Sequence, residues 1–335
     1  MRPSGDVGLT GLSGKARLAH DGRWSQVEEP WMPSEMSSAK KSVASHLRVW
    51  VLASRPRTLT AAVTPVVVGT ALAVRAKALN PPLAIAALVA AVLIQIGANL
   101  ANDLFDFRKG ADTPDRQGPP RVTSAGWLSP RSVEIGMWLT FGLAALFGLY
   151  LVYAGGWPIL AIGVASILAG LAYTGGPVPL GYVGLGDLLV FIFFGLVAVG
   201  GTYYLQARAL VPPVFWAASA IGALTTNILV VNNVRDADTD RAAGKRTLAV
   251  LLGREAARGE YAALVLVAYA TPFVLWLVFQ MSPWVLLTLL SLPLAVRLAR
   301  VVLTATDGPV LNRTLAATAQ LVAVYGALLA VGIIL

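Results

Sequence analysis

The chain has 335 residues, of which 56% are hydrophobic and only 13% charged, and it contains no cysteine. A mean hydropathy of +0.69 is more than a water-soluble domain can bury, so the composition indicates an integral membrane protein without disulfides, cysteine-ligated zinc or thiol chemistry. The net charge of +9 needs no nucleic-acid partner, because basic residues at a membrane surface meet anionic lipid.

The N-terminal segment differs from the rest of the chain. Residues 1–45 are polar and lack the continuous apolar core of a secretory signal, so we expect a disordered cytoplasmic extension, with Met32 or Met36 as alternative starts. Residues 46–57 then mix apolar and basic side chains around Trp50. That mixture predicts a short helix at the membrane interface.

Nine apolar windows follow, each near the length of about 20 residues that a bilayer requires. Their sequences lack the alternation of barrel strands, and lipid-exposed backbone must satisfy its own hydrogen bonds. Residues 46–335 are therefore expected to form one all-α membrane domain of nine transmembrane helices. The windows lie near 58–74, 83–102, 132–153, 157–173, 185–206, 213–232, 261–280, 283–303 and 315–335.

Lysine and arginine residues are distributed unevenly between the two sets of loops. They are concentrated before the first window and in the loops after the second and sixth windows, whereas the loops on the other side carry few. The positive-inside rule then places the N-terminus and these basic loops in the cytoplasm. The sequence thus predicts a multi-pass protein of the plasma membrane, in contact with the lipid bilayer and with its C-terminus outside.

Two aspartate clusters follow the second and sixth windows. Carboxylates three or four residues apart lie on one face of a helix, and hard Mg²⁺ takes oxygen ligands that it shares with substrate phosphates. Interleaved lysine and arginine side chains suit a diphosphate better than a bare metal. Together the clusters predict an Mg²⁺-dependent diphosphate site, built from Asn102, Asp103, Asp106, Lys109 and Asp112 and from Asp236, Asp240, Lys245 and Arg246.

A cation transporter is the alternative from a different class, because paired carboxylates in membrane segments also mark ion pathways. Against it, these acids lie at the cytoplasmic ends of the windows rather than at the membrane midplane. They are also mixed with cations, which a metal pathway would not favour.

Several motifs in order resemble the UbiA superfamily of intramembrane aromatic prenyltransferases, over roughly residues 50–335. Within it, the chain is most similar to the MenA-type branch, which prenylates 1,4-dihydroxy-2-naphthoate in menaquinone synthesis. One departure is Val178, where that branch often has a lysine, and Lys109 or Arg121 is the candidate to replace it. The motifs are Ser-Arg-Pro-Arg-Thr-Leu at 54–59, the two aspartate clusters, Gly-Pro-Pro-Arg at 118–121, Tyr-Thr-Gly-Gly-Pro at 173–177 and Gly-Lys-Arg-Thr-Leu-Ala-Val at 244–250.

The resemblance implies transfer of a polyprenyl chain from a polyprenyl diphosphate to 1,4-dihydroxy-2-naphthoate with decarboxylation, which gives demethylmenaquinol. Another aromatic acceptor, such as 4-hydroxybenzoate, homogentisate or a chlorophyllide-type ring, remains the alternative. The catalytic residues are expected to be Asp106, Asp236, Asp240, Lys109 and Tyr173. The expected Mg²⁺ ligands are Asp103, Asp106, Asp112, Asp236 and Asp240. Diphosphate is expected at Lys109, Arg121, Lys245, Arg246 and Asn102, and the acceptor at Arg55, Arg57 and Tyr182.

Overall fold

The computed structural model describes residues 17–18, 24–25, 43–111 and 117–335. It contains two compact units, Met1–Arg48 and Val49–Leu335. In the first unit, strands β1 (Arg17–Leu18) and β2 (Trp24–Ser25) pair in antiparallel register. Most of the predicted N-terminal extension, including Met32 and Met36, lies outside the described residues.

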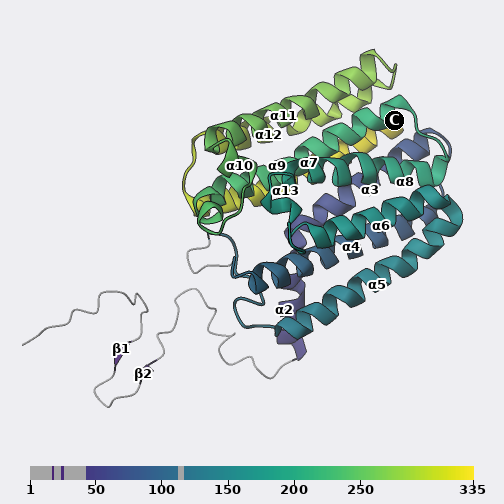
Figure 1. Ribbon diagram of the computed structural model, residues 1–335. Coiled ribbons are helices and arrows are strands. Elements are labelled where there is room, and N and C mark those ends of the chain that lie inside the picture. Colours follow the sequence, from purple (N-terminus) through teal and green to yellow (C-terminus); the bar gives the residue numbers. More distant parts are fainter. Residues whose placement is uncertain (1–16, 19–23, 26–42, 112–116) are drawn as a thin grey trace, which may run out of the picture. The chain divides into compact units, whose positions relative to one another are not determined.

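The second unit is a bundle of helices (Figure 1). Helix α2 (Val43–Ala53) lies in the region where the sequence predicts an interfacial helix. The following elements are α3 (Pro56–Arg75), α4 (Pro81–Arg108), α5 (Pro130–Gly155), α6 (Trp157–Ala172), η1 (Leu180–Tyr182), α7 (Gly186–Val190), η2 (Phe191–Val197), α8 (Ala198–Ala207), α9 (Pro212–Ala242), α10 (Leu248–Leu251), α11 (Arg254–Leu277), η3 (Pro283–Ser291), α12 (Leu292–Thr304) and α13 (Gly308–Ile334).

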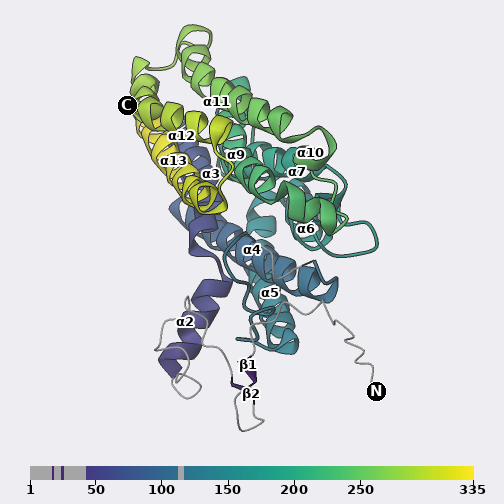
Figure 2. The same ribbon diagram turned by 90° about the vertical axis from the view of Figure 1, so that its left-hand side faces the viewer.

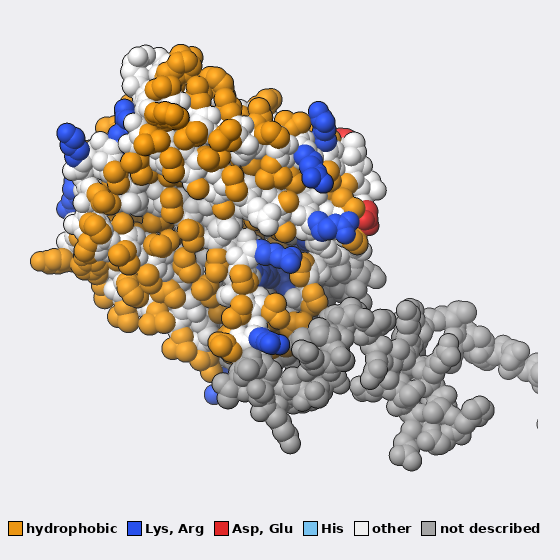
Figure 3. All heavy atoms as spheres, turned by 180° about the vertical axis from the view of Figure 1, so that it is seen from behind, with side chains coloured by type: hydrophobic (Ala, Val, Ile, Leu, Met, Phe, Trp, Pro, Cys, Tyr) orange, Lys and Arg blue, Asp and Glu red, His pale blue; other side chains and the backbone are white. Residues whose placement is uncertain are grey.

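Each of the nine predicted windows coincides with a helix, which confirms the all-α membrane architecture. Within the described part of the chain, 8 helices are long and apolar enough to cross a bilayer, counting α7–η2–α8 and η3–α12 as one helix each. Helix α6 has only 16 residues, which at 1.5 Å per residue is about 24 Å against a hydrocarbon core of about 30 Å. Figure 3 shows the broad hydrophobic surface that such a bundle presents to lipid.

Four helices extend well beyond their predicted windows. Helices α11 and α13 begin at Arg254 and Gly308 rather than near 261 and 315. Helix α4 continues to Arg108 rather than ending near 102, and α9 continues to Ala242 rather than ending near 232. The charged side chains lower the local hydropathy, but the helices persist because Leu104 and Val234 in the same turns are buried in the core. Both aspartate clusters therefore begin on the last turns of helices rather than in loops.

Helix α9 lies inside the bundle, between α11 and α7 (Figures 1 and 2). It is buried along most of its length, and the π-helix η2 packs closely against it. A side chain at Gly195 would lie 2.7 Å from the carbonyl of Ala218 and 2.8 Å from Gly222. Glycines at this contact let the two backbones approach, and so fix the position of α7 relative to α9.

Polar contacts mark the two ends of the bundle. At one end, the Thr174 hydroxyl after α6 donates to Asn102 Oδ1 on α4 over 2.9 Å. At the other end, the backbone N–H of Asn80, before α4, donates to Gln206 Oε1 on α8 over 3.1 Å. The aspartate cluster of α4 therefore lies beside the C-terminal end of α6.

Candidate active site

A cavity of about 850 Å³ runs through the bundle. On α4 its lining residues extend from Ala87 to Asp106, which corresponds to about 28 Å along the helix axis. Apolar side chains line most of this length, and polar side chains gather at the end near Asp106. The predicted site residues that line it are Arg55, Arg57, Asn102, Asp103, Asp106, Arg121, Tyr173, Tyr182, Asp236, Asp240 and Lys245.

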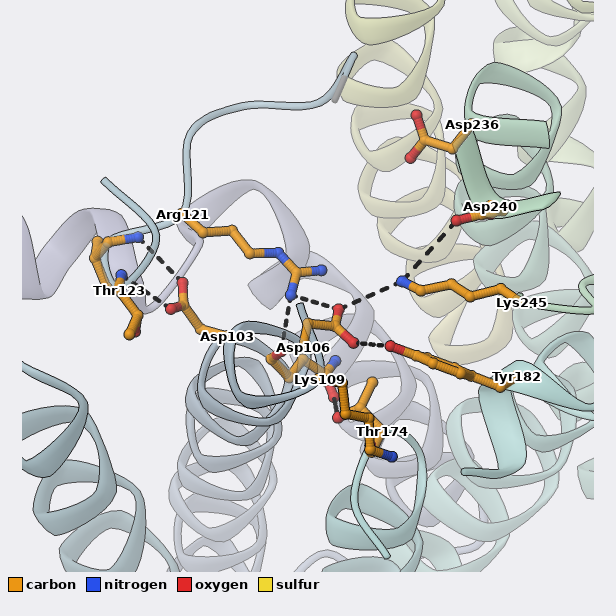
Figure 4. A network of polar contacts seen from close by, with 12 residues as sticks. Asp103, Asp106, Lys109, Arg121, Thr123, Thr174, Tyr182, Asp236, Asp240 and Lys245 are labelled. Atoms are coloured by element: carbon orange, nitrogen blue, oxygen red, sulfur yellow. Dashed lines mark hydrogen bonds and ion pairs between the residues drawn. The ribbon is translucent and has the colours of Figure 1, made fainter. Parts of the chain in front are cut away.

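Asp106 is the centre of the polar end (Figure 4). Its carboxylate is buried, accepts a hydrogen bond from the Tyr182 hydroxyl and pairs with the Arg121 guanidinium. The Lys245 ammonium lies 3.6 Å from Asp106 Oδ2. Arg121 also donates to the backbone oxygen of Asn102 over 2.8 Å. Two basic side chains of the kind that bind phosphate groups thus lie beside Asp106.

Lys245 connects the two aspartate clusters. Its ammonium lies 3.9 Å from Asp240 Oδ1 as well as near Asp106, and it lies 4.7 Å from the centre of the Tyr182 ring. Lys109 lies 5.2 Å from the centre of the same ring. The sequence assigned Tyr182 to the acceptor, but the structure places it among the cations at the polar end, where its ring faces both ammonium groups.

Lys109 does not line the cavity but binds the turn that follows α6. Its ammonium donates to the carbonyl oxygens of Thr174 and Gly176, over 2.8 and 3.1 Å. Partial burial lowers the pKa of Lys109 and the nearby charge of Lys245 adds to this, whereas Asp106 opposes it. Lys109, at the end of α4, therefore binds the turn that precedes Val178. Val178 is the position at which the MenA-type branch often has a lysine.

Asp103 holds the loop that carries Arg121. Its two carboxylate oxygens accept hydrogen bonds from the backbone N–H groups of Val122 and Thr123, each over 3.1 Å. The carboxylate is buried, and it positions the loop through both oxygens. Asp112, which the sequence placed in the same cluster, lies outside the described residues.

Asp236 is bound by its sequence neighbour. Arg235 donates to Oδ1 of Asp236 over 2.7 Å and to Oδ2 over 2.5 Å. The same guanidinium donates to Asn232 Oδ1 over 2.7 Å and to Asn312 Oδ1 over 2.6 Å. Sequence reasoning gave Arg235 no role, and Asn312, at the start of α13, carries no signal in the sequence that links it to this site.

The start of α3 forms another wall of the cavity. Asn99 on α4 donates to the Ser54 carbonyl over 2.9 Å and to the Thr58 hydroxyl over 3.1 Å. Between them, Arg55 has a left-handed backbone conformation with φ of 51°, and both Arg55 and Arg57 line the cavity. The two predicted acceptor-binding arginines thus line the cavity at the start of α3, where Ser54 and Thr58 contact Asn99 of α4.

Comparison with known proteins identifies the family. A sequence profile of the UbiA prenyltransferase family matches residues 62–332. The chain belongs to the UbiA prenyltransferase family. It is similar to 1,4-dihydroxy-2-naphthoate octaprenyltransferases of Mycobacterium tuberculosis, at 43% identity over 83% of this chain and 96% of the relative, and of Escherichia coli, at 40% identity over 81% and 91%.

Solved structures of UbiA homologs share the fold. The apo homolog from Aeropyrum pernix gives a TM-score of 0.62 at 16% identity, covering 80% of this chain and 97% of that one. A homolog from Archaeoglobus fulgidus, bound to DMAPP and Mg²⁺, gives 0.59 at 15% identity, covering 84% and 99%. The helical bundle of this UbiA-family chain is therefore a multi-pass membrane fold.

In this UbiA-family chain, the predicted site residues are only partly gathered at the cavity. Asp106, Arg121, Tyr182 and Lys245 form one contact network. Arg246 contributes its backbone N–H to the carbonyl of Tyr182 over 2.8 Å, and its exposed side chain lies outside the cavity lining. Among the residues that the structure describes, no group of three or more His, Cys, Asp or Glu side chains is placed to hold a metal ion.

Proposed function

We propose that this chain transfers a polyprenyl group from a polyprenyl diphosphate to 1,4-dihydroxy-2-naphthoate with loss of CO₂, a step of menaquinone biosynthesis that gives demethylmenaquinol. The curated relatives that carry this activity in their names match across 91% and 96% of their lengths. The observation in the molecule that supports the proposal most is a long apolar cavity with a polar end, where Arg121 and Lys245 lie beside aspartates. It suits a ligand with a diphosphate head and an apolar chain.

The residues at the polar end are suited to ionising a prenyl diphosphate. When the C–O bond breaks, negative charge grows on the leaving diphosphate, and Arg121 and Lys245 supply fixed positive charge beside it. The allylic cation that remains needs a dry pocket with aromatic faces, which Tyr173 and Tyr182 provide at the cavity wall. We assign the longer apolar part of the cavity to the prenyl chain.

The side chains at the polar end also fit Mg²⁺. Carboxylate and amide oxygens of Asp106, Asp236, Asp240 and Asn102 line the same cavity, and a substrate phosphate supplies the remaining ligands that Mg²⁺ prefers. Because Arg121, Lys245 and Arg235 pair with these acids, the proposal requires the cations to turn toward the diphosphate. When bound, Mg²⁺ supplies Lewis-acid stabilisation of the leaving group. The homolog with DMAPP and Mg²⁺ is consistent with this cofactor.

We also propose nine membrane crossings, with α6 as the ninth. Helix α5 ends at Gly155, where an added side chain would lie 3.1 Å from Leu205 of α8. The next residue of α8, Gln206, contacts Asn80 at the end of the bundle opposite the aspartate cluster of α4. Helix α6 starts there and ends beside Asn102. It therefore returns the chain to the polar end, despite its short length. The basic loops support our proposal that this end and the N-terminus face the cytoplasm, in a protein of the plasma membrane.

We place the acceptor carboxylate near Arg55 or Arg57, which line the cavity beside α4. To test the proposed function, the purified protein in lipid nanodiscs is given geranylgeranyl diphosphate, Mg²⁺ and equal concentrations of 1,4-dihydroxy-2-naphthoate and 4-hydroxybenzoate. We expect the kcat/KM for the naphthoate to be at least about 10³-fold higher than the kcat/KM for 4-hydroxybenzoate, because a polar site rejects acceptors that leave its groups unpaired. Preference for the benzoate would refute the acceptor assignment.

A further inference from the structure

A buried carboxylate on the cavity wall has no part in the network around Asp106. Asp187 is the second residue of α7, is 4% exposed and lines the cavity. Its side-chain partner within the described chain is the Asn233 amide, whose nitrogen lies 3.3 Å from each carboxylate oxygen. The buried acids Asp106 and Asp236 are instead paired with arginines.

The position of Asp187 is fixed by its neighbours. Its partner Asn233 lies on α9 one turn before Asp236, which is about 4.5 Å along the helix axis. The close contact between η2 and α9 at Gly195 keeps the two helices together. The π-helical segment Phe191–Val197 begins one turn after Asp187, directly after α7, and such segments frequently occur at functional sites. Asp187 therefore lines the same cavity as Asp236, next to Asn233.

A structural role alone explains Asp187 poorly. A carboxylate in the first turn of a helix is stabilised by the helix dipole, and the bond to Asn233 joins α7 to α9. An asparagine at this position would make the same interhelical contact without the cost of burying a charge that has no cation beside it. An ionisable group on the wall of a substrate cavity is instead placed to exchange a proton with the substrate.

We propose that Asp187 is the general base for the hydroxyl group of the aromatic acceptor, an inference that rests on the proposed function. Asp187 removes the proton of the hydroxyl next to the carboxyl-bearing carbon, and the oxygen electron pair makes that carbon nucleophilic. The carbon forms the new bond to the prenyl chain while the C–O bond to diphosphate breaks and its electron pair leaves with the diphosphate.

The same residue then returns the proton. The prenylated ring carries a carboxylate on a carbon next to a carbonyl, so CO₂ departs and its bonding pair forms an enolate. Protonated Asp187 gives its proton back to the enolate oxygen, which restores the aromatic diol. Protons balance over the cycle, and the base is regenerated without any further reactant.

The charges around Asp187 suit this role. The titratable groups that interact with it electrostatically are the Tyr173 phenol, which follows α6, and the Glu260 carboxyl on α11. On α9, Arg235 and Asp236 neutralise each other. Tyr182, from the neighbouring η1, directs its hydroxyl to Asp106. No cation of the described chain forms an ion pair with Asp187, so its carboxylate remains available to a hydroxyl in the cavity.

The test compares Asp187→Asn with Glu134→Gln, a matched change of a surface carboxylate that pairs with Arg108. Both are assayed in nanodiscs with geranylgeranyl diphosphate and 1,4-dihydroxy-2-naphthoate. We expect Asp187→Asn to lower kcat by about 10²-fold or more, as general-base loss does, with the Kd of an unreactive thiodiphosphate analogue within about twofold of wild type. Glu134→Gln should retain wild-type kcat.

A second readout separates proton transfer from structure. Acceptor analogues with more acidic hydroxyls ionise without a base, so the deficit of Asp187→Asn should shrink as the hydroxyl becomes more acidic or as the assay pH rises. Asp187→Glu keeps an acid and should show no such dependence. A deficit equal for all acceptors, or Asp187→Asn at wild-type rate, overturns the inference. If wild type prenylates another phenol instead, the proposed function fails, and the same comparison on that phenol still decides the role of Asp187.

Discussion

The Arg235–Asp236 pair is expected to stabilise the fold strongly, and substituting Arg235 by Met tests this. The guanidinium makes two hydrogen bonds to Asp236, at 2.7 and 2.5 Å, and its side chain is 1% exposed. Removing one partner of a buried pair leaves an uncompensated charge, which costs about 3–5 kcal/mol of unfolding free energy. The double change Arg235→Met with Asp236→Leu removes both charges and should cost much less than the two single changes added together.

Unfolding free energies of the four proteins in mixed micelles give the coupling energy directly. We expect the double variant to fall short of additivity by about 2 kcal/mol or more, the upper part of the range for residues in contact. The control is Arg108→Met, which breaks an exposed pair with Glu134 and should cost about 1 kcal/mol or less. Additive effects of the two buried substitutions would show that the pair contributes little, contrary to the geometry.

Three further outcomes follow from the site and its proposed orientation. Asp106→Asn should lower turnover by about 10²-fold or more, and EDTA should abolish wild-type activity until Mg²⁺ is restored; turnover in metal-free protein contradicts the metal assignment. Gly148→Phe should impair octaprenyl transfer far more than geranyl transfer, because Gly148 lines the cavity with open space beside it; equal impairment contradicts the assigned chain path. In intact cells, a cysteine at Ala209 should react with an impermeant thiol reagent and one at Ala111 should not, and the reverse overturns the orientation.

The sequence predicted the helices well and several of their ends poorly. A bilayer requires long apolar runs, so hydropathy alone locates each helix. It cannot locate the ends of α4 and α9, because a helix can continue through charged residues when its other face is buried, as Leu104 and Val234 are. The count of crossings depends on α6, whose 16 residues are fewer than a typical span needs.

At the site, the motifs of the sequence pointed to several residues that lie together in the structure. They brought together Asp106, Arg121 and Lys245, which the structure places in contact. The motifs could not show that Asp103 would hold the loop at Val122. Nor could they show that Asn312 on α13 would bind Arg235, because partners distant in sequence meet only through the packing of the bundle.

Asp187 was missed for a related reason. Its sequence neighbours carry no other charge, and a single acid between apolar segments reads as the start of a helix. Only the approach of α7 to α9 brings it to Asn233 and to the cavity wall. A lone ionisable residue that borders a membrane helix is therefore worth examining as a functional candidate once the packing is known.

The central claim, transfer to the carboxyl-bearing carbon of 1,4-dihydroxy-2-naphthoate, is tested most directly by the fate of that carboxylate. Attack at this carbon cannot restore aromaticity by losing a proton, so the carboxylate must leave. With carboxyl-labelled naphthoate, we expect one labelled CO₂ released per prenyl chain attached. Retention of the label in a prenylated product, or release of CO₂ without prenylation, would contradict it.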